Sequence, residues 1–156
     1  DPEEAIRDLD SGLQHADRAL SVAQSAIRDP QRRRQIEQLA GRLRGLQTHT
    51  GRMVGVLDTA ENIDRVVEFA EALNDIPDDI ASDPQGAADA FGRVLASAGE
   101  LGQLLPQGPW TPYFRFLSGM RNFFTDMLHA LDPGLRWREE FEMIEREGAG
   151  TTERGI

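Results

Sequence analysis

The side chains best suited to chemistry in this 156-residue chain are three histidines and a few adjacent carboxylates. None of the histidines lies in an H-E-x-x-H motif. Asp126 and His129 come nearest to the carboxylate–histidine spacing that di-iron bundles use on two helices. Because this spacing occurs once and uses a short carboxylate, we predict no metal and no other cofactor. A carboxylate- or metal-dependent enzyme is therefore the last of three hypotheses for function.

The sequence also lacks motifs for nucleophilic catalysis or phosphate binding. It has no cysteine, no G-x-S-x-G elbow and no Walker loop. Adjacent carboxylates such as Asp78 and Asp79, or Glu139 and Glu140, are typical of solvated helix and loop surfaces, whereas acid–base catalysis needs carboxylates in a shared cleft. The loop around Asp78 has no glycine or final glutamate at the positions of a calcium-binding loop. We predict that the protein is not an enzyme.

The elements that must position these side chains are helices, because apolar residues recur at alternating steps of three and four. One such stripe covers residues 6–27, and a second covers 36–60 with Thr50 as a polar interruption. Stripes of this kind are typical of helices that pack on a facing helix. His15 and His49 fall outside both stripes, so we expect them at the solvated surface.

Asp29 and Pro30 separate the two stripes. They supply an N-cap acceptor followed by the residue best suited to the first helical position. The sequence therefore predicts a long, coiled-coil-like antiparallel hairpin over residues 1–58. If its second helix runs from Pro30 to about Leu57, that helix is about 40 Å long at 1.5 Å per residue.

Residues 59–82 are predicted to hold a helix and an acidic loop. Thr59 is a candidate N-cap, although one continuous helix from Pro30 to Leu73 is almost equally compatible with the pattern. The run NDIPDDIASDP interrupts the helix and places the main loop at residues 74–83. The residues expected on the buried side of the helix are Ile63, Val66, Val67, Ala70, Leu73 and Ile76.

Residues 83–147 are predicted to hold the most apolar helices. The first begins after Asp83, and its Gly92 and Gly99, one heptad apart, would allow another helix to approach closely. The second covers the aromatic stretch from Tyr113 to Leu131. It is apolar over most of its circumference, so we expect it at the centre of the bundle.

Together these patterns predict an all-α bundle of five or six helices, mostly up-down, forming one domain over residues 1–147. A closing helix carries Trp137, which either covers the end of the bundle or anchors a partner. Residues 148–156 have no apolar periodicity and are expected to form a flexible tail. The two N-terminal stripes could also pair between subunits and form a homo-oligomer.

Charge is spread unevenly along a chain whose net charge is -10. Residues 31–60 hold six Arg and two acids, whereas residues 61–100 hold ten acids and two Arg. Arg32, Arg33 and Arg34 lie near a predicted helix N-terminus, where positive charge opposes the helix dipole. An acidic partner would suit them, either within the chain, which we favour, or outside it. We predict no nucleic-acid binding, because an acidic chain repels phosphate backbones.

The leading hypothesis is a non-enzymatic protein–protein interaction module, such as an adaptor, chaperone, immunity-type protein or effector-delivery domain. The Arg-only basic residues indicate a GC-rich bacterium, which suggests a secretion or interbacterial competition system. The favoured location is the bacterial cytoplasm, with a secreted or delivered fragment as the alternative. The candidate partner-binding residues are Arg32, Arg33, Arg34, Asp78, Asp79 and Trp137.

The second hypothesis is a membrane-active protein that inserts the hairpin over residues 84–131. Length argues against a simple span, because only five residues separate Arg115 from Arg121 and a spanning helix needs about 20 largely apolar residues. Membrane binding therefore stays possible but is not favoured.

Overall fold

The computed structural model describes residues 1–120, and 81% of these residues are helical, with no strand among them. The prediction of an all-α multi-helix bundle is confirmed. The elements are α1 (Pro2–Ala26), α2 (Pro30–Gln47), α3 (Thr50–Met53), η1 (Val54–Val56), α4 (Ala60–Asn74), η2 (Ile80–Ser82), α5 (Pro84–Leu104) and α6 (Thr111–Ser118), where η denotes a 3-10 helix.

Several predictions concern residues 121–156 and lie outside the described residues. They are the second half of the aromatic helix, the closing helix with Trp137, the Asp126 and His129 pair, and the tail over 148–156.

The first two helices form an antiparallel hairpin with a three-residue connection. Asp29 caps α2, because its Oδ1 accepts a hydrogen bond from the backbone N–H of Gln31 at 3.1 Å. Side-chain contacts define the register. Residue numbers fall along α1 as they rise along α2 and into α3: Gln24 with Glu37, Asp17 with Arg44, and Asp10 with Thr50.

The second helix is shorter than predicted. It ends at Gln47, and the chain continues as α3 and η1, so a single helix from Pro30 to about Leu57 is wrong. The Oγ1 atoms of Thr48 and Thr50 lie 2.7 and 3.0 Å from the carbonyl oxygens three residues earlier. Such side-chain bonds to the backbone compete with regular helical bonds, which explains a break at this point.

α4 begins where the predicted Thr59 cap places its start. Thr59 Oγ1 accepts a hydrogen bond from the backbone N–H of Asn62 at 3.1 Å, which starts α4. The alternative of one continuous helix from Pro30 to Leu73 is therefore wrong. α4 ends at Asn74 and Asp83 caps α5, so the loop covers residues 75–83 and begins one residue later than predicted.

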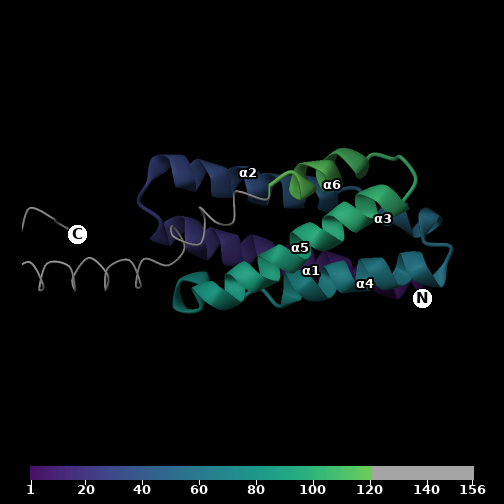
Figure 1. Cartoon of the computed structure of the whole chain (residues 1–156), viewed down its shortest axis with the longest axis horizontal. Coiled ribbons are helices and arrows are strands. Elements are labelled where there is room, and N and C mark those ends of the chain that lie inside the picture. Colours follow the sequence, from purple (N-terminus) through teal and green to yellow (C-terminus); the bar gives the residue numbers. More distant parts are fainter. Residues whose placement is uncertain (121–156) are drawn as a thin grey trace, which may run out of the picture.

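The five longer helices pack in a closed ring (Figure 1). α1 lies between α2 and α4, α4 packs on α5, α5 packs on α6, and α6 returns to α2. α1 and α4 run parallel, because Gly12 faces Leu73 and His15 faces Ile76. Ion pairs show that α5 then runs back along α4: Arg65 with Glu100, and Asp75 with Arg93.

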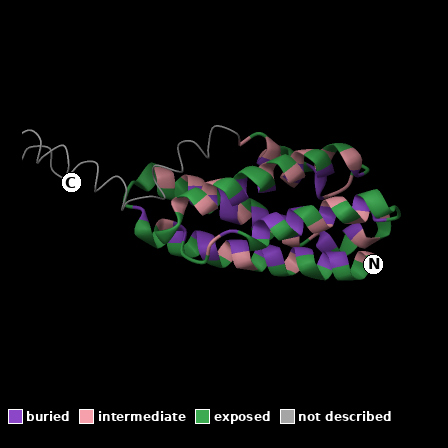
Figure 2. Ribbon diagram, turned by 60° about the horizontal axis from the view of Figure 1, so that its bottom comes forward, coloured by how far each residue is buried: buried purple, intermediate pink, exposed green. Residues whose placement is uncertain are grey.

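The apolar core fills the inside of this ring (Figure 2). Phe69 of α4 and Phe114 of α6 are both fully buried inside the ring of helices. Their aromatic rings meet edge to face, with centroids 5.7 Å apart. Among the described residues, the exposed large hydrophobic side chain is Val22. No buried side-chain nitrogen or oxygen in this part of the chain lacks a hydrogen-bond partner.

The described part of the aromatic segment is one member of the ring of helices and does not lie at its centre. α6 packs on α5 and α2, with Phe114 and Leu117 buried but Tyr113 and Phe116 only half-buried. The prediction of a central helix is therefore wrong for these residues. Tyr113 rests on Gly45 of α2, where an added Cβ would collide with the Tyr113 ring. The absence of a side chain at Gly45 is what lets α6 close the ring.

The two glycines predicted to accept a neighbouring helix have different surroundings. An ideal Cβ on Gly99 would lie 3.6 Å from the Cβ of Ser118 in α6, an ordinary packing distance, so contact with a helix is confirmed there. An ideal Cβ on Gly92 would meet nothing within 4 Å. No described atom covers Gly92, so for this glycine the prediction is not tested by the described residues.

This difference makes Gly92→Ala a stabilising substitution. Alanine is favoured over glycine in a helix interior by about 1 kcal/mol, and no atom of residues 1–120 lies where it would oppose the gain at Gly92. We expect the free energy of unfolding in urea to rise by about that amount. An unchanged or lower value would show that the position is covered.

Candidate functional site

One side of the molecule carries a concentration of arginine. Residues 28–52, which include α2 and α3, hold seven Arg and two acids, a net charge of +5 in a chain of net charge -10. Six of these arginines are exposed. We call them the basic face: Arg28, Arg33, Arg34, Arg42, Arg44 and Arg52.

The predicted triad of arginines has three different environments. Arg33 donates from Nε and Nη2 to the carbonyl oxygen of Ile27, at 3.1 and 2.6 Å, and so satisfies a carbonyl beyond the end of α1. The Nε of Arg32 lies 4.0 Å from Asp29 in the same connection. Arg34 is exposed and has no hydrogen bond or ion pair within the described residues. Of the three, Arg34 is therefore the residue best placed for a partner.

Two further arginines of the basic face contact neighbouring helices. Arg44 binds Asp17 of α1 with 2.6 Å between Nη1 and Oδ1. Arg42 lies over the ring of Phe116 in α6, 4.6 Å from its centroid. Both side chains remain exposed, so these contacts leave the face positive.

A second face is acidic. Residues 60–83 hold eight carboxylates and one Arg, a net charge of -7, and all eight carboxylates are exposed. α4 and α2 lie on opposite sides of α1, so the acidic and basic regions are well separated (Figure 1). We call these eight residues the acidic face: Glu61, Asp64, Glu68, Glu71, Asp75, Asp78, Asp79 and Asp83.

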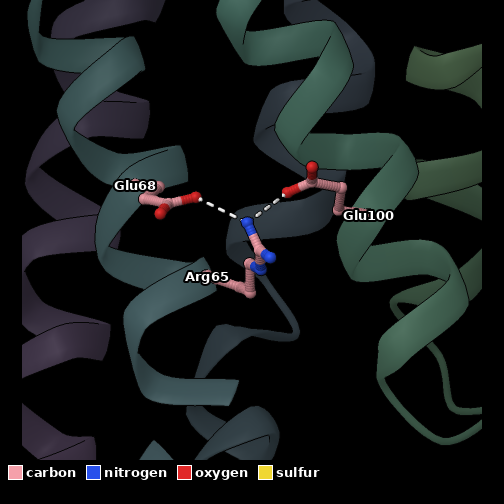
Figure 3. Close-up of polar contacts among 3 residues, drawn as sticks. All are labelled: Arg65, Glu68 and Glu100. Atoms are coloured by element: carbon pink, nitrogen blue, oxygen red, sulfur yellow. Dashed lines mark hydrogen bonds and ion pairs between the residues drawn. The ribbon is translucent and has the colours of Figure 1, made fainter. Parts of the chain in front are cut away.

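The cation within the acidic face ties α4 to α5 (Figure 3). Arg65 Nη1 lies 2.9 Å from Glu100 Oε2 and 3.2 Å from Glu68 Oε2. The charge of Glu100, and then the hydrogen bond and charge of Glu68, raise the pKa of Arg65 above its ordinary value. Because the cluster is exposed to water, it orients side chains more than it stabilises the fold.

A shallow groove of about 250 Å³ runs between α4 and α5 beside this cluster. Glu68, Glu71 and Glu100 line it together with Arg93. Arg93 is itself paired with Asp75, at 2.8 Å. The groove therefore extends the negative surface of the acidic face onto α5.

The acidic loop contacts α1 through His15. Its Nε2 lies 2.5 Å from the carbonyl oxygen of Ile76, and its Nδ1 lies 3.4 Å from Asp78 Oδ1. The His15 side chain is 16% exposed, so the prediction of a solvated surface position is wrong. Asp79, the other predicted residue of this loop, is exposed.

His49 is also more enclosed than predicted. It is half-buried, and its ring lies 5.6 Å from that of Tyr113, measured between centroids. The partners of His15 and His49 lie about 60 residues away in the chain, so the local pattern around each histidine carries no sign of them.

The structure does not merge the predicted residues into one site. The start of α2, with Arg32, Arg33 and Arg34, and the loop with Asp78 and Asp79 lie toward the same end of the bundle (Figure 1). They offer two charged surfaces of opposite sign.

The described residues provide neither a metal site nor a membrane span. No group of three or more His, Asp or Glu side chains within residues 1–120 is placed to hold a metal ion. None of the helices in this part is long and apolar enough to cross a bilayer. Within the 84–131 hairpin, Trp110 is buried and donates from Nε1 to the carbonyl oxygen of Pro106 at 3.0 Å, so insertion would have to break this packing.

Comparison with known proteins finds no matching family model, no similar curated protein and no similar solved structure. Any functional proposal therefore rests on the charge and geometry described above.

Proposed function

We propose that this protein is a non-enzymatic protein–protein interaction module that binds charged partners through its basic and acidic faces. The observation that carries the proposal is the separation of charge, with +5 on residues 28–52 and -7 on residues 60–83. Opposite charges mixed over one surface would cancel at short range. Charges separated on different helices create surface potentials that steer oppositely charged partners into place.

The apolar surface supports the same proposal. Within the described residues, Val22 is the large hydrophobic side chain left exposed, so charged side chains dominate the surface offered to a partner. Recognition by charge suits transient binding, in which charged residues at the rim control association rate and specificity. An adaptor, chaperone, immunity-type or delivery role in a bacterial secretion or competition system fits such binding, in the bacterial cytoplasm or after delivery.

The proposal is tested with two charge-reversed variants. The basic-face variant combines Arg34→Glu and Arg52→Glu, because neither arginine side chain has an ion pair or hydrogen bond within the described residues. The acidic-face variant combines Glu71→Arg and Asp79→Arg. Glu71 lies in the last turn of α4, where a positive charge suits the helix dipole, and position 34 lies in the early part of α2, where a negative charge does. All four substituted side chains are exposed, so both variants should fold.

We expect one of these variants to lose at least about tenfold in capture of a defined host protein, because like charges placed opposite each other cost several kcal/mol. Wild-type capture should fall when salt is raised from about 50 to 500 mM, since screening shortens the reach of surface charge. The matched control reverses Arg7 and Arg18 of α1 to Glu and should retain capture. Full capture by both face variants, or capture insensitive to salt, would show that these faces are not the binding surfaces.

A further inference from the structure

The contact between His15 and the acidic loop depends on the protonation state of the imidazole. A neutral imidazole has one N–H group. The carbonyl oxygen of Ile76, 2.5 Å from Nε2, can only accept, so in the neutral ring the proton must lie on Nε2. Nδ1 then presents a lone pair to Asp78 Oδ1 at 3.4 Å, and that oxygen also only accepts when the carboxylate is ionised. Two acceptors therefore face each other.

Protonation reverses the sign of this interaction. In the imidazolium, both ring nitrogens are donors, so Nε2 keeps its bond to Ile76 and Nδ1 gains an ionised acceptor in Asp78. Histidine is the side chain whose charge ordinarily changes between pH 5 and 8. The contact between α1 and the loop is therefore attractive when the imidazole is protonated and unfavourable when it is neutral.

Several other charged groups lie near the His15 imidazole, and some of them contact other residues. On α1, the nearest on the same side by helical spacing are Asp8, two turns earlier, and Arg18, about one turn later. The final turn of α4 contributes Glu71, which lines the groove toward α5. In the loop, Asp75 pairs with Arg93 of α5, Asp79 follows Asp78, and Asp83 caps α5. η2 carries no charged side chain. Asp78 is the carboxylate that contacts the ring.

The fold restricts the effect to a short part of the loop. Ile76 and Ile80 are both buried in the core, at 1% and 0% exposure, and fix the loop on either side. Between them, the side chains of Asp78 and Asp79 are exposed. A change at His15 can therefore reposition Pro77 to Asp79 without unfolding α4 or α5.

We propose that His15 is a pH-dependent latch, whose protonation ties Asp78 and the acidic loop to α1. Below the pH range in which histidine loses its proton the latch is closed, and as pH rises through that range it opens. The consequence for binding rests on the proposed function: the closed latch occupies one carboxylate of the acidic face, so a basic partner of this loop binds less well in acid.

The latch is tested on the free protein by amide hydrogen exchange at pH 5 and pH 8. The reporter is the N–H of Ser82, which donates to the carbonyl oxygen of Asp79 at 3.2 Å. Because Asp78 is 94% exposed, the ion pair has the strength of a surface pair, so we expect the wild-type protection factor at pH 5 to be about 1.5- to fivefold that at pH 8.

Three variants separate the latch from general charge effects. His15→Gln keeps a donor for Ile76 but cannot titrate, and Asp78→Asn removes the ionised acceptor, so each should abolish the pH dependence. Asp79→Asn removes the neighbouring charge and should leave it intact. A pH dependence that is absent from the wild type, or that survives in Asp78→Asn, overturns the latch. Neither outcome involves a partner, so the proposed function would stand or fall separately, on the charge-reversed variants.

Discussion

Phe69→Ala is expected to lower the free energy of unfolding by about 3 to 5 kcal/mol, the usual cost of removing a fully buried phenylalanine. Phe69 has no exposed surface and meets Phe114 edge to face at the centre of the ring. The substitution leaves a cavity between helices that pack on several neighbours, so collapse around it would disturb the whole bundle. Urea denaturation followed by circular dichroism measures the change.

The matched control for this prediction is Val22→Ala, because Val22 is 47% exposed and should change stability by no more than about 0.5 kcal/mol. A double-mutant cycle with Phe114→Ala adds a second readout, with an expected coupling of about 0.5 to 1.5 kcal/mol for an aromatic pair. A loss below about 1 kcal/mol for Phe69→Ala, together with zero coupling, would mean that α4 and α6 do not meet in the core.

Gly12→Val should destabilise the protein by about 3 kcal/mol, at the upper end of the cost of overpacking. Gly12 is buried where α1 crosses α4, and an ideal Cβ there would lie 3.0 Å from Leu73 Cβ and 3.1 Å from the carbonyl oxygen of Ala70. Both atoms belong to the backbone or lie next to it, so α4 itself must move to make room. The measurement is again equilibrium unfolding in urea.

The same substitution at Gly92 is the control, because no described atom lies within 4 Å of an added Cβ there. Gly92→Val should leave stability unchanged or slightly raised, since valine is a better helix former than glycine. Equal effects at the two glycines would argue against the parallel packing of α1 on α4.

The first apolar stripe shows how much of the fold the sequence predicts. Every position of that stripe is buried, because one face of a long helix must bury whatever its partners are: Ile6, Leu9, Leu13, Ala16, Leu20, Ala23 and Ile27. The residues predicted on the buried side of the helix after Thr59 did not include Phe69, which is one of the largest fully buried side chains. In a ring each helix touches two neighbours, so its apolar arc is wider than the stripe of a two-helix hairpin.

Apolar periodicity could not predict other features of the fold. They depend on side-chain bonds within a few residues or on contacts between residues far apart in the sequence. The break after Gln47 follows from threonine side chains bonding to the backbone, yet the stripe continues across it, with Thr50, Met53 and Leu57 all buried. Apolar spacing therefore could not reveal that the helix ends. The contact of α6 with α2 places Tyr113 over Gly45, a pair far apart in the chain.

The candidate site divides in the same way. Counting charges along the chain predicted a basic stretch and an acidic stretch, but their places in space follow from the order of helices in the ring, with α2 and α4 on either side of α1. The engagement of Arg33 with Ile27 and of Asp78 with His15 also needs three-dimensional contacts. Trp137 lies outside the described residues and keeps its status as a predicted partner anchor.

The central claim, that two separate faces recognise opposite charges, is tested most directly by nuclear magnetic resonance of the isotope-labelled protein with two model peptides. A hexaglutamate peptide should shift backbone amide signals of α2 and α3, and a hexa-arginine peptide should shift those of α4 and the loop over residues 75–83. Both sets of shifts should fade at about 500 mM salt, because surface charge is then screened within a few ångströms. If both peptides perturb the same amides, or neither perturbs any, the two-face account is contradicted.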